Sequence, residues 1–198
     1  MKELNGLTDE ELAILYVKGN NKAFDILLAR TQNKLFAYIM FMVHDQSVAD
    51  DIFQETFIKV ITKLHAGEYA TTGKFLGWCM RIAHNVVMDW YRDRKTEHIV
   101  DAPVDNDLCS IRTAEMIEDN IESLTVKRQI REDVCRMMNM LPVPQREVVY
   151  MRFYQRLSFK EIADMTNVSI NTSLGRMHYA IINLRRMAKE HNVQLQAE

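Results

Sequence analysis

The hydrophobic pattern of this chain is helical in nearly every segment that has a pattern. Apolar residues recur three or four positions apart, as on the buried face of an α-helix, instead of alternating as they do along strands. The chain has 198 residues, of which 47% are hydrophobic, enough for one medium domain or two small ones with packed cores. An all-α fold is therefore expected.

Four helices are expected in the first 95 residues. The first opens with the capping box Thr8–Glu11, in which a hydroxyl and a carboxylate each satisfy an amide that the helix leaves unpaired. A second helix should run from about residue 21 towards 44, and Ser47 should be the N-cap of a third. The fourth is predicted from about 74 to 94.

A break in this periodicity divides the chain. Residues 96–133 carry 4 basic and 10 acidic side chains, whereas residues 134–198 carry 9 and 5, an asymmetry that the net charge of −2 conceals. We predict an acidic flexible linker over residues 96–126. It would join two small helical domains, residues 1–95 and residues 127–198.

The C-terminal domain is predicted to contain a short helix, a tight turn and a longer helix. Ser158 opens the short helix with a second capping box, and Ser169 can cap the next helix. Ala163 is small enough to let the two helices approach closely. This describes a helix-turn-helix, whose second helix would enter the major groove of DNA. A helical hairpin that merely packs gives the same local pattern.

The two faces of the longer helix decide which side chains could reach DNA. The predicted buried stripe consists of Ile170, Leu174, Met177, Ile181, Leu184 and Ala188. The solvent face near the N-terminal end would then offer Thr172, Ser173, Arg176, His178 and Tyr179. Arg176 is the best candidate for a base contact, because its guanidinium matches the two acceptors of guanine. Phosphate or solvent is the expected environment of Arg185, Arg186 and Lys189.

Two helix faces of the N-terminal domain are charged. The third helix has an acidic face that could dock a basic partner or simply be solvated, made of Asp50, Asp51, Gln54 and Glu55. The fourth helix should expose polar and basic residues, namely Arg81, His84, Asn85 and Arg92. Aromatic residues lie between these cations, a mixture that suits unstacked bases and phosphate. Trp78 and Trp90 fit a hydrophobic core as well, and a basic helix end also fits the helix dipole.

Other function classes lack support in the sequence. The six histidines are scattered, and neither a His-Glu-x-x-His motif nor a phosphate-binding glycine loop occurs. We therefore expect no enzymatic activity, no cofactor and no metal site. Cys79, Cys109 and Cys135 are far apart and are predicted to be reduced thiols. No stretch approaches the ~20 apolar residues of a membrane span, and no secretory signal is recognisable, so a cytoplasmic protein is expected.

Four motifs combine in one order along the chain. They are DDIFQETF at 50–57, KFLGWCMRIAHN at 74–85, DWYR at 89–92 and LSFKEIA at 157–163. Together, and with this spacing, they resemble the bacterial sigma factors of the extracytoplasmic-function (ECF) type, in the sigma-70 superfamily. The resemblance implies that the N-terminal domain is sigma region 2 and the C-terminal domain sigma region 4.

For region 2, the resemblance implies two contacts. The beta-prime clamp helices of core RNA polymerase would bind Asp50, Asp51, Gln54, Glu55 and Phe57. The loop at 68–73 and the fourth helix would recognise and open the minus-ten promoter element. The residues expected on this DNA are Lys74, Trp78, Arg81, Asn85, Arg92, Arg94 and Lys95.

For region 4, the resemblance implies that the helix-turn-helix reads the minus-thirty-five element and touches the polymerase beta flap. The residues expected on this DNA are Ser158, Lys160, Thr172, Ser173, Arg176, His178 and Tyr179. The acidic linker would occupy a nucleic-acid channel of the polymerase. Members of the family are usually held inactive by an anti-sigma factor, which is often membrane-bound. Such a factor would clamp both domains of this chain. The chain itself is not expected to insert into the membrane.

The chain departs from the family pattern in the helix-turn-helix. Asn167 stands in the turn where glycine is usual, and asparagine accepts left-handed geometry better than most residues. Ser173 stands where an apolar residue is expected, and Leu174 where a basic one is common. With so few cations on this helix, weak DNA binding by the free protein is expected. A stand-alone helix-turn-helix regulator is the alternative function, but it leaves the N-terminal charged faces unused.

Overall fold

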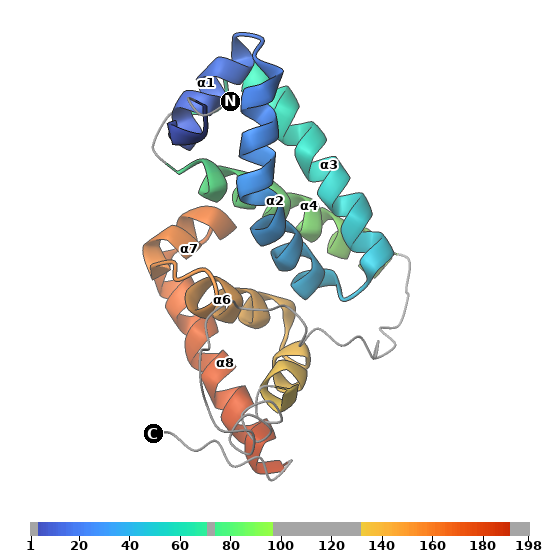
Figure 1. Ribbon diagram of the computed structural model, residues 1–198. Helices are drawn as coiled ribbons and strands as arrows, with labels where there is room; N and C mark the ends of the chain where they lie inside the picture. Colours follow the sequence, from blue (N-terminus) through green and yellow to red (C-terminus); the bar gives the residue numbers. More distant parts are fainter. Residues whose placement is uncertain (1–3, 71–73, 97–131, 191–198) are drawn as a thin grey trace, which may run out of the picture. The chain divides into compact units, whose positions relative to one another are not determined.

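The computed structural model describes residues 4–70, 74–96 and 132–190 (Figure 1). Every regular element in these ranges is a helix, which confirms the predicted all-α class. The chain divides into two compact units, Met1–Val104 and Asp105–Glu198. Residues 97–126 of the predicted linker lie outside the described residues.

The first unit is a helical bundle built around its second helix. Its elements are η1 (Leu4–Gly6), α1 (Asp9–Val17), α2 (Asn21–Val43), α3 (Gln46–His65) and α4 (Phe75–Thr96). Helix α2 packs against α1, α3 and α4, and α3 also packs on α4. The largest fully buried side chains of this core are Leu12, Leu27, Leu35, Tyr38, Ile39, Met42, Leu64, Phe75 and Met80.

The start of α1 has the predicted capping box. The Thr8 hydroxyl accepts from the Glu11 amide at 3.3 Å, and the Glu11 carboxylate accepts from the Thr8 amide at 2.8 Å. Gly19 follows the helix with φ of 99°, a conformation that costs glycine little. Residues next to each end of α1 are therefore enough to fix where this helix begins and ends.

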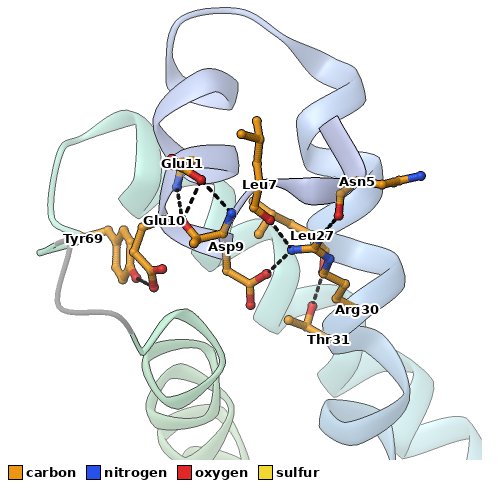
Figure 2. A network of polar contacts seen from close by, with 10 residues as sticks. Asn5, Leu7, Asp9, Glu10, Glu11, Leu27, Arg30, Thr31 and Tyr69 are labelled. Atoms are coloured by element: carbon orange, nitrogen blue, oxygen red, sulfur yellow. Dashed lines mark hydrogen bonds and ion pairs between the residues drawn. The ribbon is translucent and has the colours of Figure 1, made fainter. Parts of the chain in front are cut away.

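Arg30 of α2 holds the beginning of the chain against the bundle (Figure 2). Its guanidinium donates to the carbonyl oxygens of Leu7 at 2.9 Å and Asn5 at 2.8 Å. It also forms an ion pair with the Asp9 carboxylate at 2.8 Å. One planar cation with several donors thus binds two backbone carbonyls and one carboxylate and fixes α1 on α2.

The predicted N-cap of α3 is wrong by two residues. Asp45, not Ser47, caps the helix by accepting from the Val48 amide at 3.0 Å, and Ser47 lies inside the first turn. His44 has a left-handed conformation, with φ of 60°, immediately after α2. This residue already reverses the chain, so the helix can begin as soon as a capping side chain follows.

The second unit contains the predicted C-terminal helices. Residues 132–139 are helical, followed by α6 (Val143–Phe153), α7 (Phe159–Thr166) and α8 (Ile170–Glu190). Helix α8 packs on both α6 and α7. Helix α6 begins before the predicted residue 145, because Pro144 is tolerated in a first turn, where its missing amide is not needed.

Helices α7 and α8 form the predicted helix-turn-helix. Ser158 and Glu161 form the expected capping box. Asn167 ends α7 in the left-handed region, at φ 53° and ψ 46°. The Ser169 hydroxyl then accepts from the Thr172 amide at 3.0 Å and caps α8. Each of these local predictions is confirmed.

The buried face of α8 is rotated from the predicted one. The buried residues are Ser173, Met177, Ala180, Met187 and Ala188. Ile170, Leu174 and Ile181, predicted in the core, are 45%, 43% and 37% exposed. Ser173, predicted on the solvent face, has no exposed surface. Small side chains at Ser173 and Ala180 suit a helix that packs on both α6 and α7, so steric fit decides against the more hydrophobic stripe.

This register of α8 predicts opposite effects for adjacent lysine substitutions. Ser173→Lys would bury a charge and should abolish cooperative unfolding of the second unit. Leu174→Lys places the charge in solvent and should change the stability by less than about 0.5 kcal/mol. Ser173→Ala, which fits the same space, is the control and should fold normally. Thermal unfolding followed by circular dichroism tests the register, which equal tolerance of both lysines would contradict.

The central position of α2 predicts a large cost for a cavity there. Leu35→Ala should lower the free energy of unfolding by about 2 to 5 kcal/mol. Ile58→Ala is the control, because Ile58 is 64% exposed and its truncation removes little packing. Both tryptophans, Trp78 and Trp90, lie in the first unit. Urea titration followed by their fluorescence therefore reports on this unit, and equal losses for the two variants would contradict the prediction.

Candidate functional site

The predicted acidic face of α3 is exposed. Asp50, Asp51, Gln54 and Glu55 all lie in solvent along one side of the helix. Glu55 pairs with Lys59 at 2.7 Å one turn further on, an exposed contact that adds little stability. These carboxylates therefore do little for the fold, and they remain accessible to a basic partner.

Phe57 does not belong to that exposed face. Its side chain is buried, with its ring centroid 4.8 Å from that of Phe53 and 6.2 Å from that of Phe24. Phe57 is one turn from Phe53 on the apolar side of α3, which explains its burial. As a direct polymerase contact it is a wrong prediction, and its role is to pack beneath the face.

Ile58 is the apolar residue of the acidic face that sequence reasoning missed. It is 64% exposed and lies seven residues after Asp51, two helical turns along the same side. The signal was its position in a stripe with Asp51, Gln54 and Glu55 instead of with the core residues. On such a surface the carboxylates supply electrostatic attraction for a basic partner, and the apolar side chain supplies contact area that can be buried.

Helix α4 and the residue before it carry the predicted basic surface. Its members recur at helical spacing on one side, at Lys74, Trp78, Arg81, Asn85 and Arg92. Trp78 is half-buried and the other four are exposed. This arrangement puts cations, an amide and one aromatic ring in a row, as binding of a single strand requires.

Helix α4 differs from the prediction in one residue near its middle. His84 was expected on the exposed side but is buried, because it shares a stripe with Met80 and Val87. The Arg94 guanidinium lies over the Trp90 ring, 4.8 Å from its centroid, so both are partly covered. Lys95 belongs to α4, but its side chain lies outside the described residues.

Tyr69, between α3 and α4, was not singled out from the sequence. Its hydroxyl donates to the Glu10 carboxylate at 3.2 Å, which joins this segment to α1 (Figure 2). Its ring centroid lies 5.5 Å from that of Phe75 and 4.9 Å from that of Trp78. Burial, reinforced by the nearby Glu10 charge, raises the pKa of Tyr69, so the phenol stays protonated as a donor. No local pattern links residues 10 and 69.

The helix-turn-helix exposes most of the side chains predicted to meet DNA. Lys160, Thr172, His178 and Tyr179 are exposed, and Arg176 is half-buried. The Ser158 hydroxyl is engaged in its cap, donating to the Glu161 carboxylate at 2.8 Å. Ser173 is buried and cannot reach a base, so its assignment as a DNA contact is wrong.

Leu174 takes the exposed position beside these residues. It stands next to Ser173 on the outer side of α8, so the accessible face there is more apolar than predicted. Thr172, Arg176 and Tyr179 are spaced along one side of the helix. This row is the part of α8 that can lie against a groove.

Cys79 lies in the core of the first unit. Cys79 is a free thiol, and burial raises its pKa, which makes it unreactive. Cys109 lies outside the described residues. Within the described ranges, His, Cys, Asp and Glu side chains form no group of three that could hold a metal ion. No helix in those ranges is long and apolar enough to cross a membrane.

The sequence matches two family profiles in the order of the two units. Sigma-70 region 2 matches residues 27–97, and Sigma-70 region 4 matches residues 131–178. Together the two matches cover more than half of the chain. The first contains the charged faces of α3 and α4, and the second contains α7 and the beginning of α8.

Curated relatives match over most of their length. The ECF RNA polymerase sigma factor SigX of Bacillus subtilis is 25% identical over 83% of this chain and 83% of its own. The ECF RNA polymerase sigma-E factor of Escherichia coli is 29% identical over 88% of this chain and 91% of its own. The similarity thus extends through both units.

Solved structures share the fold. The sigma factor RpoE of Bartonella quintana, crystallised with the anti-sigma factor NepR, has a TM-score of 0.63 at 20% identity, covering 85% of this chain and 98% of that one. CnrH, in complex with the cytosolic domain of CnrY, has a TM-score of 0.62 at 21% identity, covering 92% of this chain and 97% of that one. With both regions present in order, this chain belongs to the sigma-70 family as a sigma factor of the ECF type.

Proposed function

We propose that this chain binds core RNA polymerase and directs it to a restricted set of promoters, with region 2 at residues 1–95 and region 4 at 127–198. The observation that carries this proposal is the order of the two family regions along one chain, each with exposed residues suited to its task. Sigma factors are not enzymes, and they act through the polymerase that they bind. This function places the protein in the cytoplasm, where the polymerase and the promoters are.

The acidic face of α3 is the proposed contact with the beta-prime clamp helices. Its exposed carboxylates would steer a basic helical surface, and Ile58 would add apolar contact once the surfaces meet. Since the ion pair between Glu55 and Lys59 is exposed, it is easily exchanged for an intermolecular one. Asp51 and Ile58 are the central residues of this contact.

The basic face of α4 is the proposed contact with the minus-ten element. A sigma factor has no chemistry with which to separate strands, so opening must draw on binding energy for bases that leave the stack. Trp78 offers a ring for such a base, and Lys74 and Arg81 offer charges for the phosphates on either side. Residues 71–73 of the loop implicated by the family pattern lie outside the described residues.

The outer face of α8 is the proposed contact with the minus-thirty-five element. Arg176 is the one arginine among the residues proposed for this DNA, and guanine is the base that its guanidinium matches best. The neighbouring Leu174 contributes no charge towards phosphate. Affinity for this element would therefore come mainly from the polymerase, which holds the helix-turn-helix against promoter DNA.

An anti-sigma factor is a further proposed partner. The two solved structures described above are complexes, one of RpoE with the anti-sigma factor NepR and one of CnrH with the cytosolic domain of CnrY. Such a partner would compete with the polymerase if it covered the acidic face of α3. Binding of core polymerase would then require release of the inhibitor first.

Transcription in vitro separates the proposed function from that of a stand-alone regulator. A sigma factor should co-purify with core polymerase and should start transcripts from its own promoters only when both components are present. A stand-alone regulator would bind duplex operators tightly without polymerase and would fail to support initiation. The second result would overturn the proposal.

Reversing one charge on α3 should weaken core binding. Asp51→Lys is expected to reduce the affinity for core polymerase by about tenfold or more, because it places a cation against a basic partner. Asp25→Lys, the same change on the exposed side of α2, is the matched control and should bind normally. Fluorescence anisotropy of labelled protein measures both. Unchanged binding of Asp51→Lys would remove this face from the mechanism.

Truncating Arg176 should relax promoter choice at one position of the minus-thirty-five element. Arg176→Ala is expected to cost about 1 to 3 kcal/mol of discrimination against the wrong base there. Arg185→Ala is the control on the same helix, and it should lower activity evenly across promoter variants, as loss of a phosphate contact does. Transcription from a set of single-base promoter variants measures the preference. A uniform loss for Arg176→Ala would show that it reads no base.

A further inference from the structure

Helix α1 lies outside the part of the chain that matches region 2. That match begins at residue 27, whereas α1 covers Asp9–Val17. Yet α1 is tightly integrated, with Leu12, Ala13 and Tyr16 buried and Arg30 bound to the segment around it. A helix fixed in this way can hold in place the side chains that contact it.

Glu10 is the residue through which α1 reaches the segment before α4. Its carboxylate accepts the hydrogen bond from the Tyr69 hydroxyl at 3.2 Å, joining residues 59 positions apart. The neighbouring Asp9 is held by Arg30 at 2.8 Å, so the turn that carries Glu10 is itself anchored (Figure 2).

The Tyr69 ring lies against the residues that begin α4. It meets Phe75 edge-on, with an interplanar angle of 90°, and lies tilted against Trp78 at a centroid distance of 4.9 Å. Phe75 is fully buried, whereas Trp78 is half-buried and belongs to the row proposed for the minus-ten strand. The preceding chain is constrained as well, by an ion pair between Lys63 and Glu68 and by Gly67 at φ 72°.

We infer that Tyr69 is a positioning residue for promoter opening: Glu10 holds its hydroxyl, and its ring holds Trp78 in the orientation that receives an unstacked base. This inference rests on the proposed function and deepens it. It assigns α1, which makes no DNA contact of its own in the proposed function, to the minus-ten site.

The physical reason is preorganisation. If the Trp78 ring became ordered only when a base stacked on it, it would lose rotational freedom at that step. This entropy cost would reduce the binding free energy available to separate the strands. The Trp78 ring already packs against both Tyr69 and Phe75, with centroid distances of 4.9 and 5.9 Å, and so avoids this loss. Freeing Tyr69 should therefore slow strand opening while leaving the polymerase contact on α3 intact.

Removing one hydroxyl tests the inference in the complete holoenzyme. Tyr69→Phe keeps the ring and loses only the bond to Glu10, so we expect opening of duplex promoter DNA to slow about fivefold. Tyr154→Phe, which removes a hydroxyl from a tyrosine of the second unit that is 43% exposed, is the control and should open at the normal rate. Opening is followed by the fluorescence of 2-aminopurine placed in the minus-ten element.

Variants of Glu10 test whether the bond itself is responsible. Glu10→Ala should slow opening as much as Tyr69→Phe, and the double variant should be no slower than either single one. Glu10→Gln keeps an acceptor oxygen and should restore most of the rate. Additive losses in the double variant would show that the two residues act separately and would overturn the inference.

Templates that are already unpaired separate positioning from general damage. On a promoter mismatched across the minus-ten element no strands need separating, so Tyr69→Phe should initiate within twofold of the unmodified protein. An equal loss on both templates, or a normal opening rate on the duplex, would overturn the inference. If the unmodified holoenzyme opens no promoter at all, the proposed function itself fails, and this result appears without any variant.

Discussion

The buried stripe of α2 is the constraint on which the rest of the first unit depends. Leu27, Leu35, Ile39 and Met42 have no exposed surface, and α1, α3 and α4 all pack against this helix. Because each partner must turn its apolar side towards α2, the rotation of α3 and α4 is fixed. The acidic and the basic rows face solvent for that reason, so the exposure of both charged surfaces follows from the packing of one core.

Elements with a local cause could be predicted from the sequence. The capping boxes at Thr8 and Ser158 join residues three positions apart, and the left-handed turn at Asn167 depends on that residue alone. The spacing of polar residues on α3 and α4 likewise follows from helical geometry. Most of the fold and the outline of the charged faces were therefore predictable, as was the family.

What could not be predicted depends on residues distant in the chain. Helix α8 has two stripes one residue apart, and only close packing against α6 and α7 selects the one through Ser173 over the one through Leu174. His84 is a different case, because its stripe with Met80 and Val87 is local and helical spacing could have predicted its burial. The bond between Glu10 and Tyr69 has no local signature, since helical periodicity says nothing about which loop will meet which helix.

The surfaces proposed for partners share one property, which is that each is weak alone. Exposed carboxylates on α3 and a sparsely charged outer face on α8 would each contribute modest binding energy in water. Because one chain carries both surfaces, formation of the first contact makes the second contact intramolecular. The high effective concentration then raises the overall affinity above that of either contact alone. A complex that engages only one of these contacts forfeits this gain. Selectivity would thus come from the requirement for simultaneous contacts rather than from the strength of any single one.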